Sequence, residues 1–280
     1  MRFIEFIKAI ILGIVEGITE WLPISSTGHM ILIDEFLQLN VSENFMEMFL
    51  VVIQLGAILA VPILFWNKLY PFSRQNTKEQ NLAIWNTWGK VIVGAIPAAI
   101  LGVLLDDLLD KYLYNYVVVA IALVVYGVAF VLIEKNKAES DFAVKSIHEM
   151  SYADALKIGG FQVLSLVPGT SRSGSTILGG MISGVSRSVS AEFSFFMAIP
   201  IMLGASALKI LKFVLEGFTV SKGELMVLII GIAVSFVVSL FVIKFLMEFV
   251  KNHDFKIFGY YRIILGVIVL GYFLVKGLIA

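Results

Sequence analysis

Two short stretches hold most of the residue types that could do chemistry in this apolar chain. Residues 16–29 (EGITEWLPISSTGH) bring two carboxylates, a group of hydroxyls and a histidine around one proline. Residues 162–175 (QVLSLVPGTSRSGS) bring an arginine among serine, threonine and glycine. Carboxylates, hydroxyls and a guanidinium together suit the binding and transfer of a phosphate group. We expect the two stretches to be halves of one such site, at membrane depth.

Glu16 and Glu20 stand four residues apart, so a helix places both carboxylates on one face. Two like charges at membrane depth are costly unless a cation or an arginine lies between them. The pair therefore predicts a site for a divalent cation, Mg²⁺ or Ca²⁺, or one acid beside one metal ligand. The alternative is a pair of carboxylates solvated at the headgroup boundary, and the apolar residues on both sides argue against it.

Ser25, Ser26, Thr27, Gly28 and His29 follow the first proline. Hydroxyls and free backbone N–H groups in a glycine-containing turn form a concavity that binds phosphate. A histidine beside a serine can activate the serine as a nucleophile or protonate a leaving group. The alternative is an ordinary helix cap, because serine and threonine are common N-cap residues. The nearby glutamates favour the functional interpretation.

Arg172 is the most informative single residue, because an arginine flanked by apolar helix is expensive in a bilayer without an anionic partner. A guanidinium binds phosphate oxygens through two parallel hydrogen bonds, and Thr170, Ser171, Ser173 and Gly174 can add donors. The alternative, a salt bridge to one of the two glutamates, does not exclude this role. The segment lacks the lysine of a nucleotide-binding P-loop, which disfavours nucleotide hydrolysis.

The composition places these residues in a membrane. Of 280 residues, 59% are hydrophobic and 15% are charged, which is too apolar for a soluble protein. Long unbroken apolar runs indicate helices rather than a barrel. The net charge is zero and cysteine is absent, so nothing indicates a nucleic-acid partner, disulfides or thiol catalysis. The two glutamates stand where a signal-peptide cleavage site would need small residues, so we expect no cleavage there.

Six apolar runs are predicted to cross the membrane: 45–66, 91–105, 117–133, 189–208, 225–243 and 257–279. The run 6–15 is shorter than the ~20 residues of a span, and it leads into the polar stretch, so residues 4–38 predict a re-entrant helical hairpin. The same pattern returns at 155–184. Polar connections are expected at 67–90 and 106–116, the second a solvated loop holding Asp106, Asp107 and Asp110 rather than a metal cluster.

The two hairpins indicate an internal duplication. S-S-T-G at 25–28 aligns with S-R-S-G at 171–174, and Glu16 then falls opposite Gln162. We predict an all-α polytopic membrane protein with a first repeat at 1–134, a linker at 135–154 and a second repeat at 155–280. Each repeat holds one hairpin and three spans. Three is odd, so the second repeat is predicted to be inverted, with the site near the bilayer midplane.

The basic residues set the expected orientation. More lysines and arginines fall on the side that holds the 67–90 and 135–154 connections than on the side of the termini. The positive-inside rule makes the richer side cytoplasmic. Both termini are therefore expected outside.

These motifs resemble those of a known family. EGITEWLPISSTGH and PGTSRSG resemble the two signatures of the bacterial undecaprenyl-diphosphate phosphatases, also called bacitracin-resistance proteins. The resemblance runs the whole chain and includes QLGAIL at 54–59 and AEFSFFMAIP at 191–200. No motif position departs from the family pattern.

The resemblance implies an enzyme of the bacterial plasma membrane that removes the terminal phosphate of undecaprenyl diphosphate, a polyprenyl diphosphate lipid. That reaction recycles the lipid carrier of cell-wall synthesis and confers bacitracin resistance. The resemblance also implies divalent-cation dependence, with Glu16 and Glu20 as the acidic pair, Ser26 and His29 as catalytic candidates and Arg172 as the phosphate clamp. The family's site is thought to open outward. Membrane lipids surround such a protein. Whether two copies form a homodimer is undecided by the sequence.

A rival interpretation is transport, because inverted repeats with broken helices also build transporters, and a fold does not fix a function. A lipid-phosphate flippase would use the same site and release no phosphate. A type-2 phosphatidic-acid phosphatase is disfavoured, because its K-x₆-R-P and P-S-G-H signatures are absent from the chain. Whether Ser26 or His29 is the nucleophile is undecided by the sequence, and locating the phosphate on a trapped phospho-enzyme would decide it.

Overall fold

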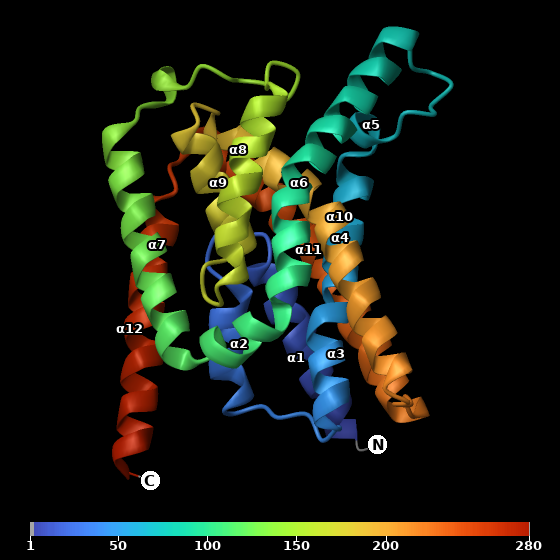
Figure 1. Cartoon of the computed structure of the whole chain (residues 1–280), viewed down its shortest axis with the longest axis vertical. Helices are drawn as coiled ribbons and strands as arrows, with labels where there is room; N and C mark the ends of the chain where they lie inside the picture. The colour runs from blue at the N-terminus through green and yellow to red at the C-terminus, as the bar shows by residue number, and fades with distance from the viewer. Residues whose placement is uncertain (1–2, 280) are drawn as a thin grey trace.

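The computed structural model describes residues 3–279, and the regular elements within them are helices. Six segments in this part of the chain are long and apolar enough to cross a membrane (Figure 1). Their helices are α3 (Glu43–Val52) with α4 (Gln54–Leu64), α6 (Lys78–Leu113), α7 (Tyr116–Asn136), α10 (Arg187–Leu215), α11 (Lys222–Asn252) and α12 (Lys256–Ile279). The prediction of an all-α polytopic membrane protein is confirmed.

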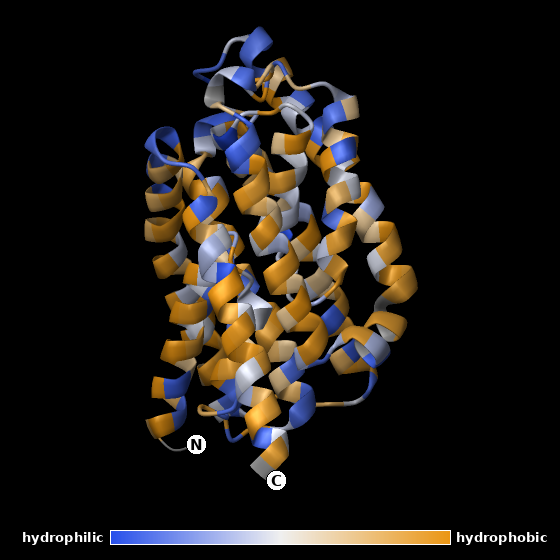
Figure 2. Ribbon diagram, turned by 90° about the vertical axis from the view of Figure 1, so that its left-hand side faces the viewer, coloured by the Kyte–Doolittle hydropathy of each residue, from blue (hydrophilic) through white to orange (hydrophobic). Residues whose placement is uncertain are grey.

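Figure 2 supports this assignment in space. Apolar residues cover the long sides of the helices, and hydrophilic residues gather at the two ends of the molecule and at its interior turns. Outward-facing side chains within the spans are large and apolar, as at Leu59, Ile92 and Ile121. A surface of this kind needs a lipid solvent, so the protein is a multi-pass membrane protein.

Two short helical hairpins interrupt the series of spans. The first joins α1 (Phe3–Thr19) to α2 (Ser26–Asp34), and the second joins α8 (Tyr152–Val163) to α9 (Arg172–Ile182) through the 3₁₀ turn η2 (Leu164–Leu166). None of these helices is among the six candidate spans of the described chain. These two helix–turn–helix units overlap the ranges 4–38 and 155–184, and their re-entry into the membrane stays a prediction.

The helix α6 corrects two predicted connections. Its 36 residues begin with a capping box, in which Thr77 accepts from the backbone N–H of Gln80 at 3.2 Å and Gln80 accepts from that of Thr77 at 2.8 Å. This cap starts the helix inside the expected loop 67–90, and the helix continues to Leu113, through most of the expected loop 106–116. Asp106, Asp107 and Asp110 are thus helical, while their side chains lie outside the described part of the structure.

The remaining predicted boundaries shift by up to nine residues, the most at the end of α11, because an apolar run marks the part of a helix within lipid rather than its ends. The 135–154 linker shortens to residues 137–151 with one 3₁₀ turn, η1 (Glu139–Asp141). Lys90 of α6 anchors it, donating to the carbonyl oxygen of Ile147 at 2.9 Å. A short helix, α5 (Trp66–Leu69), follows the first span.

Close helix contacts position both hairpins. The helix α1 packs on α11, and α8 packs on α6, so each hairpin rests on the middle span of the opposite half. Glycine permits this approach: a Cβ at Gly17 would lie 2.8 Å from the Ser235 carbonyl oxygen, and Gly159 lies directly against the Gly94 carbonyl. This reciprocal packing treats the two halves alike, and the internal repeat and its inversion stay predictions.

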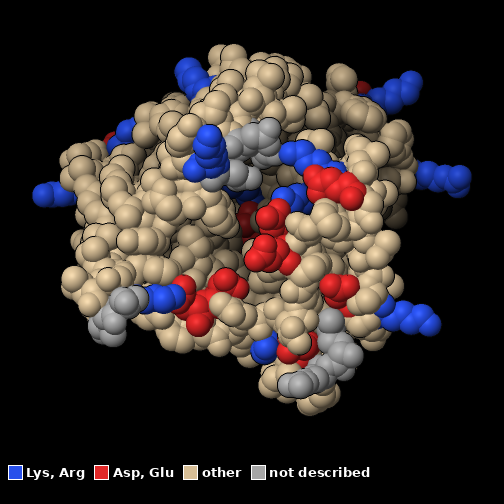
Figure 3. All heavy atoms as spheres, turned by 60° about the horizontal axis from the view of Figure 1, so that its bottom comes forward, with Lys and Arg blue, Asp and Glu red and all other residues tan. Residues whose placement is uncertain are grey.

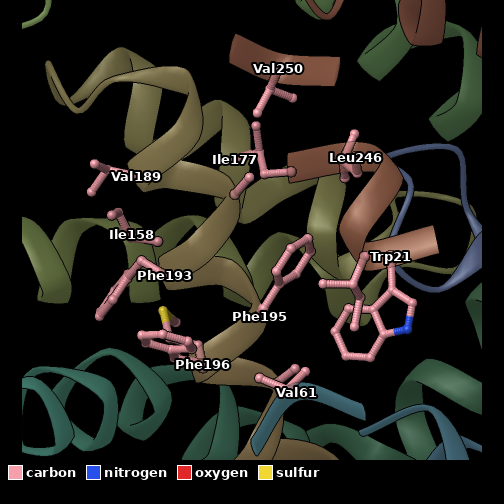
Figure 4. Close-up of a cluster of buried hydrophobic side chains, with 14 of the residues drawn as sticks. Trp21, Val61, Ile158, Ile177, Val189, Phe193, Phe195, Phe196, Leu246 and Val250 are labelled. Carbon is pink, nitrogen blue, oxygen red and sulfur yellow. The ribbon is translucent and has the colours of Figure 1, made fainter. Parts of the chain in front are cut away.

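The first turn is anchored in the main hydrophobic cluster (Figure 4). Trp21, fully buried, meets the edge of Phe195 of α10 with ring centroids 5.1 Å apart. The other labelled residues come from α4, α8, α9, α10 and α11, so one core supports the turns of both hairpins. This packing holds the polar residues that follow.

Both ends of the described chain lie at the same end of the molecule, where α1 begins and α12 ends (Figure 1). Seen from that end, the surface is hollowed at its centre, and acidic and basic side chains line the hollow (Figure 3).

Candidate active site

The structure brings the two turns into direct contact. Arg172, the first residue of α9, donates from Nη2 to Oε1 of Glu20 at 2.9 Å. Beside this ion pair, Ser173 donates its hydroxyl to the backbone oxygens of Glu20 at 3.1 Å and Leu22 at 3.2 Å. Residues about 150 positions apart in the chain therefore share one site.

Three groups hold the Arg172 guanidinium. Besides Glu20, Ser194 of α10 accepts from Nη1 through its carbonyl oxygen at 2.9 Å and its hydroxyl at 3.1 Å. The guanidinium also lies over the ring of Trp21, 5.4 Å from its centroid. Its side chain is nearly buried, so the charge is fixed in direction and poorly screened. Such a cation favours an anion close by.

Glu20 joins this cation to the candidate nucleophile. Ser26 donates its hydroxyl to Oε2 of Glu20 at 3.1 Å, while Oε1 of the same carboxylate holds Arg172. A carboxylate within hydrogen-bond distance of a serine hydroxyl can accept its proton. Ser26 itself is half-buried.

Glu16 lies one helical turn before Glu20. Its carboxylate is close enough to interact with the carboxylate of Glu20 and with the guanidinium of Arg172. Among the described residues its Oε1 is a buried oxygen with no hydrogen-bond partner. A buried oxygen of this kind fits a hard cation, which prefers oxygen ligands. Among the described side chains, no group of three or more acidic or histidine residues could hold a metal ion, so this pair is the candidate.

His29 does not meet Ser26 as the sequence suggested. Within residues 3–279 no hydrogen bond joins the two; the hydroxyl of Ser26 turns to Glu20 instead. His29 is held at Nδ1 by the carbonyl oxygen of Ser25 at 2.7 Å and at Nε2 by the hydroxyl of Tyr261 at 2.7 Å. The hydrogen bond between Nδ1 and the carbonyl oxygen of Ser25, the N-cap of α2, holds the ring so that Nε2 faces Tyr261 of α12.

Comparison with known proteins identifies the family. The family model of the bacitracin resistance protein BacA matches residues 9–268. The chain belongs to this family. It is 58% identical to an undecaprenyl-diphosphatase of Enterococcus faecalis over 273 residues, covering 96% of this chain and 98% of that protein. An undecaprenyl-diphosphatase of Desulfitobacterium hafniense is 55% identical over 280 residues, covering 100% of both chains.

Several of the predicted donors in this BacA-family site are buried in the turns themselves. Ser25 and Ser171 are N-caps, and their hydroxyls accept from the N–H groups of Gly28 at 3.3 Å and Gly174 at 3.1 Å. The cap interpretation therefore applies to both serines. Ser25, Gly28, Thr170, Ser173 and Gly174 are buried, whereas Ser26, Thr27, His29, Ser171 and Arg172 are half-buried.

Both cap serines have an unusual backbone. Ser25 and Ser171 each have φ of 73°, and they are the only non-glycine residues with positive φ in the described chain. Such a conformation costs on the order of 1–3 kcal/mol and persists where the surroundings enforce it, often at functional sites. The two turns thus share one strained geometry at the positions that the sequence alignment pairs.

Arg262 of α12 is a site residue that the sequence analysis missed. Its fully buried guanidinium donates to the Pro23 carbonyl oxygen of the first turn at 3.1 Å. The same guanidinium donates to the carbonyl oxygens of Gly169 and Thr170 in the second turn, at 2.9 Å each. Arg262 therefore fastens both turns together. The signal was present, because an arginine in an apolar span deserves the attention that Arg172 received.

We expect Arg262→Met to lower the free energy of unfolding by about 2–4 kcal/mol, since three carbonyl oxygens lose their donor inside the protein. Thermal unfolding of the purified protein in detergent measures the change. Ile264→Met, on the exposed face of the same helix, is the matched control and should leave the unfolding midpoint nearly unchanged. A midpoint of Arg262→Met equal to that of the unaltered protein would refute the fastening role.

Proposed function

We propose that this chain hydrolyses undecaprenyl diphosphate to undecaprenyl phosphate and inorganic phosphate, and so recycles the lipid carrier of cell-wall synthesis. The observation that carries the proposal is the carboxylate of Glu20, held between the hydroxyl of Ser26 and the guanidinium of Arg172. The name that its relatives bear, undecaprenyl-diphosphatase, supports the same reaction.

Arg172 binds the terminal phosphate in this mechanism. Its guanidinium exchanges part of its contact with Glu20 for the phosphate oxygens, while the bonds to Ser194 keep its direction. A guanidinium fork matches two phosphate oxygens and stabilises the charge of the transferring group. Displacing Glu20 from Arg172 also frees that carboxylate to act as a base.

The hydroxyl oxygen of Ser26 then attacks the terminal phosphorus, and Glu20 accepts its proton. The bond between that phosphorus and the bridging oxygen breaks, and undecaprenyl phosphate leaves with the electron pair. Water hydrolyses the phosphoserine, and His29 carries the proton of that water. Ser26 is favoured over His29 as nucleophile because its hydroxyl already lies against a carboxylate that can accept its proton.

A divalent cation, Mg²⁺ or Ca²⁺, fits the acidic pair. Glu16 and Glu20 would hold it, since Glu16 offers a buried oxygen that has no hydrogen-bond partner in the described part of the protein. Two carboxylates completed by phosphate oxygens and water are a usual setting for Mg²⁺. When bound, the cation offsets the negative charge of the diphosphate.

The membrane setting supports the choice of substrate. We infer that the apolar surface between the hairpins and the spans receives the prenyl tail, while the charged hollow in Figure 3 admits the headgroup from the outer side. That orientation places both termini outside and the basic 137–151 connection in the cytoplasm. It also treats the halves as inverted repeats that meet at the site.

The test is phosphate release from undecaprenyl diphosphate by the purified protein in detergent micelles. We expect turnover, and a loss of about tenfold or more when a chelator removes divalent cations, restored by excess Mg²⁺ or Ca²⁺. A flippase that does not hydrolyse would release no phosphate, so an inactive but folded protein would favour transport. Full activity in the presence of the chelator would show that hydrolysis needs no divalent cation.

A further inference from the structure

The last helix presents a tyrosine to the histidine of the first turn. Tyr261 of α12 places its hydroxyl 2.7 Å from Nε2 of His29, and the two rings stack with centroids 5.6 Å apart and planes 8° from parallel. On the other side of the imidazole, Nδ1 lies 2.7 Å from the carbonyl oxygen of Ser25. His29 thus has a hydrogen-bond partner at both ring nitrogens, and the ring of Tyr261 lies nearly parallel to its own.

These contacts determine which nitrogen carries the proton. The carbonyl oxygen of Ser25 can only accept, so Nδ1 of the neutral His29 must be the donor. Nε2 then has the free lone pair and accepts from the hydroxyl of Tyr261. When His29 gains a second proton, Nε2 becomes a donor and the same hydroxyl accepts. A phenol can do both, so the contact survives the change of charge.

We propose that Tyr261 is a positioning residue of the phosphoryl transfer, which keeps Nε2 of His29 in one direction while His29 takes up and gives back a proton. The proposal rests on the proposed function, in which His29 carries that proton. In the described structure Tyr261 makes no hydrogen bond to Glu20, Ser26 or Arg172. Its effect on the reaction must therefore pass through His29.

The neighbours of Tyr261 separate this role from simple packing. Tyr260, the preceding residue, is 53% exposed on another face of α12, and within residues 3–279 it makes no hydrogen bond to His29, Glu20 or Arg172. Tyr261 is itself 43% exposed, so its hydroxyl is not a core group whose loss would collapse the helix bundle. Replacing Tyr261 with phenylalanine removes one oxygen and keeps the ring that stacks on His29.

The first test compares Tyr261→Phe with Tyr260→Phe in the phosphate-release assay. For Tyr261→Phe we expect kcat to fall about 10- to 100-fold with KM within about twofold, because substrate binding is unchanged. Tyr260→Phe should match the unaltered protein. In the double variant with His29→Gln, the loss should equal that of His29→Gln alone, because Tyr261 then has no imidazole to hold. Additive losses, or an undiminished kcat in Tyr261→Phe, would overturn the proposal.

The second test does not need turnover. With ¹⁵N-labelled histidine, NMR should show one His29 tautomer, protonated at Nδ1, and His29→Gln identifies its signals against those of His148 and His253. In Tyr261→Phe the Nε2 signal should shift, as its hydrogen bond is lost, whereas Tyr260→Phe should leave it in place. An unchanged Nε2 signal in Tyr261→Phe refutes the proposal even if the protein proves not to hydrolyse undecaprenyl diphosphate, which is judged by phosphate release alone.

Discussion

Replacing Arg172 with lysine should reduce phosphate release by about 10²–10³-fold, the usual cost of removing one fixed donor from a developing negative charge. Lysine keeps the charge but offers a single ammonium group on a shorter reach. It cannot contact the carboxylate of Glu20 and both oxygens of Ser194 at once, as the two terminal nitrogens of Arg172 do. The bound phosphate would therefore lose its two parallel hydrogen bonds. Steady-state kinetics on undecaprenyl diphosphate measure the loss.

Arg74→Lys is the matched control for this prediction, because Arg74 is exposed in the connection between α5 and α6. It should leave turnover within about twofold of the unaltered protein. The unfolding temperature of Arg172→Lys must also be followed, since the variant weakens an internal ion pair. A folded Arg172→Lys protein with near-normal turnover would show that charge alone suffices, and the clamp would have to be abandoned.

The positions of the hairpins could be predicted because local rules decide them. An apolar run of 6–15 is too short to span, and Pro23 and Pro168 break the helices that would otherwise continue. The ends of α6 could not be predicted in the same way. Its start depends on the capping box of Thr77 and Gln80, whose polar residues also suit a loop. Hydropathy bounds the lipid-covered part of a helix and leaves its polar ends open.

Some residues of the site could be predicted from the sequence and others could not, for a similar reason. Glu20 and Arg172 were predictable as partners, because each is a charge that a membrane interior cannot hold alone. Ser194 carries no such signal, since a serine within a helix is ordinary, and it reaches Arg172 only through the packing of α10 on α9. Tyr261 is 232 residues from His29, so only the folded chain joins them. Long-range hydrogen bonds between neutral groups are what composition and spacing do not reveal.

The deeper distinction is between the groups that bind and the groups that hold the binding groups. Arg262 and Ser173 donate to backbone oxygens of the first turn, and both are fully buried. They determine how far Ser26 lies from Arg172 by fixing the turns that carry them. A site made from two separate hairpins needs such fasteners, because neither hairpin alone positions the other's side chain.

Glu20→Gln should abolish most activity, with a loss of about 10²–10⁴-fold in kcat, because the amide cannot accept the proton of Ser26. The variant keeps the size of the side chain and one hydrogen-bond acceptor. It leaves the Arg172 guanidinium without its carboxylate, so the unfolding temperature should fall as well. Glu20→Asp retains the charge but shortens the reach, and it should be impaired less if charge matters more than distance.

The control for Glu20→Gln is Glu192→Gln, which removes a carboxylate of similar burial, 8% exposed against 7% for Glu20. Glu192 pairs with Lys68 at 2.8 Å, and its position two residues from Ser194 places it on the other side of α10. Loss of an ion pair should therefore lower the unfolding temperature of both variants, whereas loss of turnover should be confined to Glu20→Gln.

If Ser26→Ala and Glu20→Gln were combined, the double variant should be no slower than the worse single one, because serine and carboxylate serve one step. Independent, additive losses would separate Glu20 from the hydroxyl of Ser26 and assign its effect to Arg172 alone.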